Sequence, residues 1–133
     1  INNVIPNEIV MNNVQELAKH ILQPLRDWYG KPIQVNSWYR SPQVNSAVGG
    51  SINSSHLLGE AVDIDTNSIN ENKKLFYYIK DNMLFDQLIW EFGGKWVHVS
   101  YRVNKVNRNQ ILIARKRRNG GIFYEQVLKD VKI

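Results

Sequence analysis

The sequence of 133 residues is 43% hydrophobic and 22% charged, a balance that is typical of a globular domain and excludes a disordered chain. It contains no cysteine, which excludes disulfide bonds and thiolate zinc sites, so any metal must bind to His, Asp, Glu or water. The formal net charge of +5 favours an anionic partner. No apolar run approaches the ~20 residues of a membrane span, so we expect no membrane insertion.

The first predicted element is an amphipathic helix over residues 14–29, where apolar side chains recur at spacings of three and four. Gly30 is expected to cap its C-terminus. Pro24 lies inside the pattern and should kink or split the helix, because proline lacks a backbone N–H and clashes with the preceding turn. His20 has no acidic or histidine partner nearby in the sequence, so we assign it to the surface or to packing.

The remaining segments alternate between strands and helices. The pair Gly93-Gly94 between two apolar runs predicts a two-residue hairpin turn. The order of elements predicts a single domain over residues 1–133 with an α+β fold, in which helices pack on a largely antiparallel sheet. After the first helix we expect strand 33–37, helix 42–48, loop 51–58, strand 61–65, helix 70–83, strands 86–92 and 95–101, and strands 110–116 and 122–127.

Two histidines and one aspartate are candidates for a metal site. His56 precedes a short strand that carries Asp63, and His98 lies in the predicted strand WVHVS. Strand alternation turns Asp63 away from its apolar neighbours, and three imidazole or carboxylate ligands with one open position are typical of catalytic zinc. The structural alternative is a hydrogen-bonded strand histidine and an aspartate that holds a loop.

Three segments together resemble one family of enzymes. Residues 54–63, SSHLLGEAVD, resemble the S-x-H-x-x-G-x-A-x-D motif of D-Ala-D-Ala carboxypeptidase-type zinc peptidases, which share the hedgehog/DD-peptidase fold. Residues 37–41, SWYRS, are similar to the family's S-G-Y-R-S segment, with Trp38 in place of glycine, and WVHVS is similar to its W-x-H-x-S segment. The resemblance extends from about residue 13 to about residue 113 and is strongest to compact peptidase domains of phage endolysins and virion-associated wall hydrolases.

This resemblance implies that His56, Asp63 and His98 bind Zn²⁺. It implies zinc-dependent hydrolysis of peptide bonds in peptidoglycan stem peptides, of the D,D-carboxypeptidase or endopeptidase type, with water as the nucleophile. It also implies action at the cell wall, outside the cell or from a phage virion. The chain begins with Ile1 and not Met, so we expect a trimmed chain that could belong to a larger lysin or virion protein.

The resemblance also implies roles for two polar residues. Arg40 would hold a substrate carboxylate or the tetrahedral oxyanion, a role that suits its planar and permanently charged guanidinium group. The alternative for Arg40 is an ordinary ion pair, with Asp65 as a candidate partner. Ser54 would line the site and contact substrate, or brace the histidine loop.

The general base is not given by the resemblance alone. Several relatives carry an acid three residues before the second histidine, where this sequence has Lys95. If Gly93-Gly94 forms a two-residue turn, Glu91 and His98 share one face of the hairpin, and Glu91 is the expected base.

A three-residue loop would reverse that parity and turn Glu91 away from the site. Asp86 would share the site face only under such a shift, and Glu60 is a third choice. A solvent-facing strand position is the structural alternative for Glu91.

Two other functions compete with catalysis. The missing acid before His98 is compatible with a catalytically weak or inactive module that keeps its metal and binds the wall. The basic run Arg115–Arg118 could contact nucleic acid, but such a run beside a turn is more typical of a solvated strand edge. We therefore expect a peptidoglycan peptide as partner and no nucleic acid.

Overall fold

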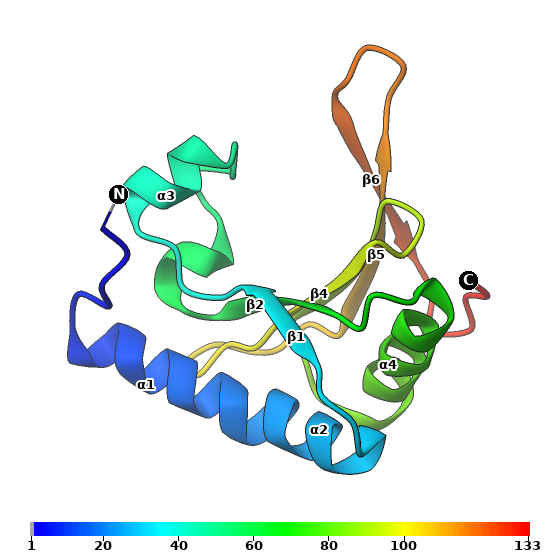
Figure 1. The fold of residues 1–133 in the computed structure, drawn as a ribbon, viewed down its shortest axis with the longest axis horizontal. Coiled ribbons are helices and arrows are strands. Elements are labelled where there is room, and N and C mark those ends of the chain that lie inside the picture. Colours follow the sequence, from blue (N-terminus) through cyan, green and yellow to red (C-terminus); the bar gives the residue numbers. More distant parts are fainter. Residues whose placement is uncertain (1) are drawn as a thin grey trace.

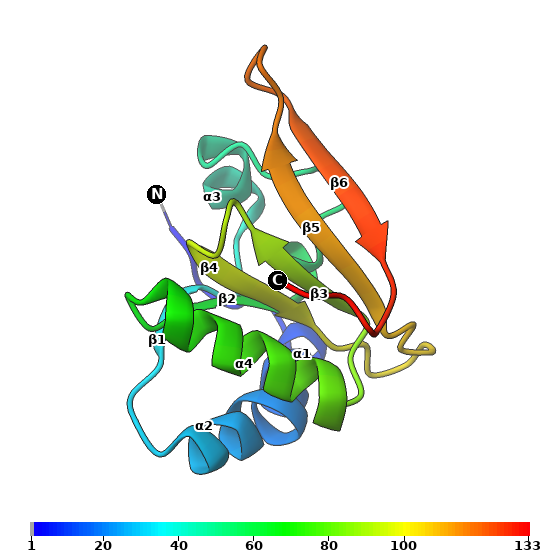
Figure 2. The ribbon, with the colours of Figure 1, turned by 90° about the vertical axis from the view of Figure 1, so that its right-hand side faces the viewer.

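A computed structural model describes residues 2–133, in which the strands form one six-stranded sheet in the order β1-β2-β4-β3-β5-β6 (Figures 1 and 2). β3 and β5 pair in parallel, and the other neighbours are antiparallel. The α+β fold with a largely antiparallel sheet is therefore confirmed, in agreement with the hedgehog/DD-peptidase type. The elements are α1 (Glu8–Leu17), a π-helical turn (Ala18–Leu22), α2 (Gln23–Tyr29), β1 (Gln34–Ser37), α3 (Pro42–Ala47), a 3-10 turn (Ser55–Leu58), β2 (Ala61–Asp65), α4 (Ile69–Asn82), β3 (Gln87–Glu91), β4 (Trp96–Ser100), β5 (Gln110–Lys116) and β6 (Ile122–Val127).

One face of the sheet packs against α1, α2 and α4, which lie together along the lower part of the molecule in Figure 1. Strand alternation sends most apolar residues of the central strands to this face and the polar residues Asp63, Glu91 and His98 to the other. The opposite face is therefore free to carry a site, with α3 and the 3-10 turn beside it. The fully buried core side chains include Leu17, Ile21, Leu25, Val62, Ile64, Leu75, Phe76, Ile79, Leu88, Val97 and Val99.

The first helix is longer than predicted and is not split at Pro24. Helical structure runs from Glu8 to Tyr29, and the turn before Pro24 is π-helical, with the Gln23 N–H bonded to the Ala18 carbonyl. A wider turn is one way for a helix to continue past a residue that cannot donate a backbone hydrogen bond. Gly30 ends the helix in the left-handed conformation, as predicted.

The turn between β3 and β4 has four residues, 92–95, and not the predicted two. Phe92, Gly93 and Gly94 all have positive φ, and the N–H groups of Gly94 and Lys95 both donate to the Glu91 carbonyl at 3.0 Å. A four-residue turn keeps the same pairing parity as a two-residue turn. Ile89 pairs with His98 and Glu91 pairs with Trp96, so the prediction that Glu91 and His98 share one face is confirmed.

Within residues 2–133, no helix has the length and apolar character needed to cross a bilayer.

Candidate active site

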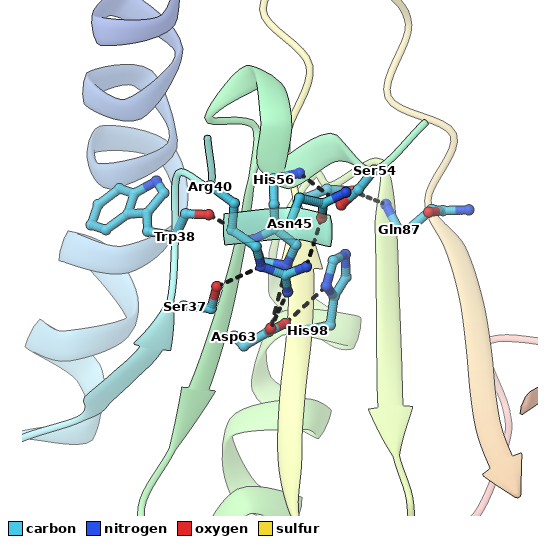
Figure 3. A network of polar contacts seen from close by, with 10 residues as sticks. Ser37, Trp38, Arg40, Asn45, Ser54, His56, Asp63, Gln87 and His98 are labelled. Carbon is cyan, nitrogen blue, oxygen red and sulfur yellow. Dashed lines mark hydrogen bonds and ion pairs between the residues drawn. The ribbon is translucent and has the colours of Figure 1, made fainter. Parts of the chain in front are cut away.

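His56, Asp63 and His98 converge on one point of the open sheet face (Figure 3). Asp63 of β2 and His98 of β4 are direct cross-strand partners, and Asp63 Oδ1 lies 2.9 Å from His98 Nδ1. His56 comes from the 3-10 turn, and its Nε2 lies 3.3 Å from Asp63 Oδ2. One candidate ligand atom from each residue lies within 4.8 Å of the others, so the group could hold a metal ion.

The His56 ring is oriented by the loop around it. Its Nδ1 lies 2.7 Å from the Trp38 carbonyl, which accepts a hydrogen bond from the protonated Nδ1. The Ser54 hydroxyl oxygen accepts the His56 backbone N–H at 3.2 Å and so caps the 3-10 turn. Ser54 also lines the adjoining cavity, so it is placed both to brace the histidine and to meet a ligand.

The arrangement of donor atoms fits a divalent cation such as zinc. Because His56 Nδ1 donates to Trp38, the neutral ring presents an unprotonated Nε2 to a carboxylate oxygen 3.3 Å away. Two facing acceptors need a proton or a cation between them. Tetrahedral zinc with bonds of about 2.0–2.2 Å separates two ligand atoms by roughly 3.3–3.6 Å, and His₂Asp is a set that catalytic zinc uses.

Asp63 is held ionised despite its burial. Burial alone would raise its pKa, but its interactions with His56 and His98 outweigh burial and lower the pKa well below the ordinary 3.8. An ionised carboxylate between two imidazoles is the form that a metal ion requires.

Arg40 is an integral part of this cluster. Its guanidinium group donates to Asp63 Oδ2 at 3.2 Å, to Ser37 Oγ at 2.9 Å and to Asn45 Oδ1 at 3.1 Å (Figure 3). Its ion-pair partner is therefore Asp63 and not Asp65. Arg40 also lines the cavity, so the group that steadies Asp63 faces the space above it.

Two neighbouring segments hold Arg40 in place. Asn3 accepts the Ser41 backbone N–H at 2.7 Å and donates to the Tyr39 carbonyl at 3.0 Å, which ties the backbone on both sides of Arg40. Gly50 packs so tightly that an added Cβ would lie 2.1 Å from Asn45 Oδ1 and 2.9 Å from Arg40 Nη1. A side chain at position 50 would therefore displace the guanidinium group or its amide partner.

Gly59 gives a first testable prediction. It ends the 3-10 turn with φ of +71°, and a Cβ there would lie 2.9 Å from Val14 and 3.1 Å from Val10 of α1. We expect Gly59→Ala to lower the free energy of unfolding by about 1–3 kcal/mol, because the change adds left-handed strain and overpacking. Urea unfolding of both proteins measures this, and Gly120→Ala, also at positive φ but with no atom within 4 Å of its Cβ, separates strain from packing.

Glu91 also faces the site. It is 7% exposed, and together with Ile89 and His98 it lines a cavity of about 590 Å³. Burial and the nearby Asp63 carboxylate raise the pKa of Glu91 from 4.5 to about 7, and Arg40 partly opposes this. A carboxyl group that titrates near neutral pH suits proton transfer.

The other candidate bases lie away from the cavity. Asp86 is paired with Arg102 at 3.1 Å and Arg108 at 2.9 Å, and burial alone would raise its pKa, but the bonds from Arg108 lower it. The pKa of Glu60 is raised, mainly by burial, but its side chain does not line the cavity. Glu91 is therefore the acid whose placement agrees best with proton transfer at the metal group.

The raised pKa of Glu91 predicts how the stability of the metal-free protein depends on pH. The folded protein keeps the proton to about pH 7 and the unfolded chain loses it near pH 4.5, so this group's contribution to stability is lost as pH rises between these values. We expect the free energy of unfolding of Glu91→Gln, minus that of the parent, to increase by about 2–3 kcal/mol from pH 4.5 to pH 8. Urea unfolding of both chelator-treated proteins across this range measures the difference, and a constant difference would contradict the prediction.

The histidine outside the site also has a partner. His20 Nε2 lies 2.9 Å from Glu16 Oε2, one helical turn earlier, so the expectation of no nearby acidic partner is wrong. Its ring stacks on Tyr101 at 4.7 Å, which agrees with its assignment to surface packing.

Sequence reasoning assigned no role to several residues at this site. Ser37 lies in a motif segment and Gly50 shortly before the next one, but the hydrogen bond from Arg40 to Ser37 and the close packing at Gly50 follow only from the fold. Tyr124 carried no signal in the sequence, because it reaches the cavity only through the parallel pairing of β3 with β5.

A largely buried His₂Asp group, an arginine and a protonatable glutamate in one cavity on an α+β sheet define a metallohydrolase type of site. A model of the Peptidase M15 family matches residues 3–100, and the chain therefore belongs to this family of zinc-dependent, D-Ala-D-Ala carboxypeptidase-like metallopeptidases. The match covers the three metal-group residues, Arg40 and Glu91 and ends before β5. A comparison with curated proteins gives no match.

Proposed function

We propose that this protein is a zinc peptidase that hydrolyses peptide bonds in peptidoglycan stem peptides, as a D,D-carboxypeptidase or an endopeptidase. The observation that carries the proposal is the placement of His56, Asp63, His98 and Glu91 around one cavity of about 590 Å³. The net charge of +5 supports an acidic polymer as the target.

His56, Asp63 and His98 are the residues that would hold Zn²⁺. Zinc bound there would act as a Lewis acid on the scissile carbonyl and lower the pKa of water. The chain fixes its ligands beforehand, because the Trp38 carbonyl orients His56 and the Arg40 guanidinium group orients Asp63.

The remaining groups would handle protons and negative charge. The Glu91 carboxylate would take a proton from the attacking water and then deliver it to the nitrogen of the leaving amine. Arg40 would bind the substrate carboxylate or the negative charge that develops on the scissile carbonyl oxygen. Ser54, in the cavity wall, would contact the bound peptide.

Mass spectrometry of purified muropeptides after incubation with the zinc-loaded protein tests this function. The expected result is cleavage at one type of peptide bond, which also identifies the bond, and no cleavage after chelation. Zinc binding with no turnover on any muropeptide would instead support a metal-containing wall-binding module.

We further propose that residues 1–133 form a single peptidase domain that acts on the cell wall from outside, as a free enzyme or within a lysin or virion protein. The motif resemblance to phage wall hydrolases supports this setting, and the proposed partner is a peptidoglycan peptide and not nucleic acid. The basic run supports the absence of nucleic acid, because Arg115 forms an ion pair with Glu125 at 3.3 Å. Arg115 lies on β5, which is next to the edge strand β6.

A further inference from the structure

The cavity over the metal group has two walls of different origin. One wall comes from residues 48–55, next to α3 and within the family match. The other comes from the β5–β6 hairpin, which supplies Leu112, Ile122 and Tyr124 and lies outside the match. Figure 1 shows this hairpin extending beyond the rest of the sheet, across from α3. The hairpin is thus an addition to the part of the chain that carries the proposed chemistry.

Sheet register determines which hairpin residues face the cavity. Tyr124 pairs with Ala114, and Ala114 pairs with Glu91, so the three lie in one row across β6, β5 and β3. Cross-strand partners share a face, and Ala114, between Tyr124 and Glu91, carries only a small side chain. Tyr124 therefore reaches the cavity from two strands away, with half of its surface exposed.

Lys116 lies on the same face, next to residues that line the cavity. It pairs with Ile122, a cavity residue, and its Nζ lies 5.5 Å from the centre of the Phe92 ring. Phe92 in turn donates its backbone N–H to the Ala114 carbonyl at 3.0 Å and lines the cavity. These contacts hold an ammonium group beside the cavity, diagonal to Tyr124, where long side chains on neighbouring strands can reach a common ligand.

The hairpin wall offers hydrogen-bond donors and contributes no acidic side chain to the cavity lining. Among the described residues that line the cavity, the acids are Asp63 and Glu91, and both lie on the floor and not on the hairpin. Burial and these two carboxylates raise the pKa of Tyr124, so its phenol keeps its proton and can donate a hydrogen bond. A phenol and an ammonium group side by side offer donors and no permanent negative charge.

We propose that the β5–β6 hairpin selects the substrate, with Lys116 and Tyr124 binding a carboxylate of the peptide that lies in the cavity. This inference rests on the proposed peptidase function and adds the substrate feature that this chain recognises. A free carboxylate would receive one charge-assisted hydrogen bond from Lys116 Nζ and one hydrogen bond from Tyr124 Oη. Amidation of that carboxylate would remove its negative charge and weaken both hydrogen bonds.

The test measures binding, so that it does not depend on turnover. The zinc-loaded Glu91→Gln protein is titrated calorimetrically with the stem pentapeptide L-Ala-γ-D-Glu-L-Lys-D-Ala-D-Ala and with two analogues. In one analogue the D-Glu α-carboxylate is amidated, and in the other the C-terminal carboxylate is amidated. One of the two amidations is expected to weaken binding about fivefold to tenfold, as for a partly desolvated charged hydrogen bond.

Lys116→Gln and Tyr124→Phe in the same background are expected to bind the pentapeptide more weakly and to lose that preference for the free carboxylate. The matched control is Arg115→Gln, which removes the same charge from the opposite face of the hairpin and should keep the preference. An unchanged preference in both Lys116→Gln and Tyr124→Phe, or no binding of any peptide, would overturn the proposal. Preference without hydrolysis by the parent would support this proposal while counting against the peptidase function.

Discussion

Replacing His56 with alanine is expected to abolish tight zinc binding and, with it, peptidase activity. The residue supplies Nε2 to the metal group, and its ring is fixed by the Trp38 carbonyl at 2.7 Å. Since the loss of a group that merely orients a ligand costs about 10- to 100-fold in metal affinity, the loss of a ligand should cost well over about a hundredfold. Elemental analysis after dialysis and a muropeptide assay measure the two effects.

Two further variants provide a second test of the metal site and a control. Asp63→Asn preserves the size of the side chain and should also lose zinc. This variant tests the metal site even if the His56→Ala protein does not fold. His20→Ala should keep both zinc and activity, because His20 lies on the helix that covers the other sheet face and contacts Glu16 and Tyr101. Activity that survives in a zinc-free His56→Ala protein would refute the proposed mechanism.

Short-range patterns predicted most of the fold. The bounds of α3, α4, β2, β5 and β6 agree with the periodic and capping signals to within one residue, because each signal depends on neighbouring residues. The helical run before Gly30 was predicted six residues too short, because its first turn is less regular in apolar spacing, although Asn7 caps it. The parallel pairing of β3 with β5 was not predicted, because it depends on the path of residues 101–109 and not on local pattern.

Site residues could be predicted from the sequence where strand alternation or a motif determines their position. Parity placed Glu91 and His98 on one face, and this held although the turn has four residues, because even-numbered turns preserve the pairing. The partner of Arg40 was not predictable, because Asp63 meets it only through the β1–β2 pairing of Ser37 with Asp63. Tyr124 shows the same limit, since its distance from Glu91 is set by two strand pairings.

Glu91→Gln is expected to lower kcat by about 10²- to 10⁴-fold, the range for loss of a general base, while zinc content stays unchanged. The amide keeps the shape of the buried side chain but cannot accept the proton from water. Glu60→Gln is the matched control, because burial raises the pKa of Glu60 as well, yet its side chain lies outside the cavity. A parent-like kcat in Glu91→Gln would reject Glu91 as the base.

The pH profile separates this role from a structural one. A base must be ionised, so kcat/KM of the parent should fall as pH drops through the pKa of Glu91. That pKa is about 7 in the metal-free protein, and a bound divalent cation adds to the effect of Arg40 and lowers it further. The acid limb should therefore lie below pH 7, and it should be absent from the residual activity of Glu91→Gln. Because packing loss alone would lower activity at every pH equally, an acid limb that persists unchanged in Glu91→Gln would assign the proton transfer to another group.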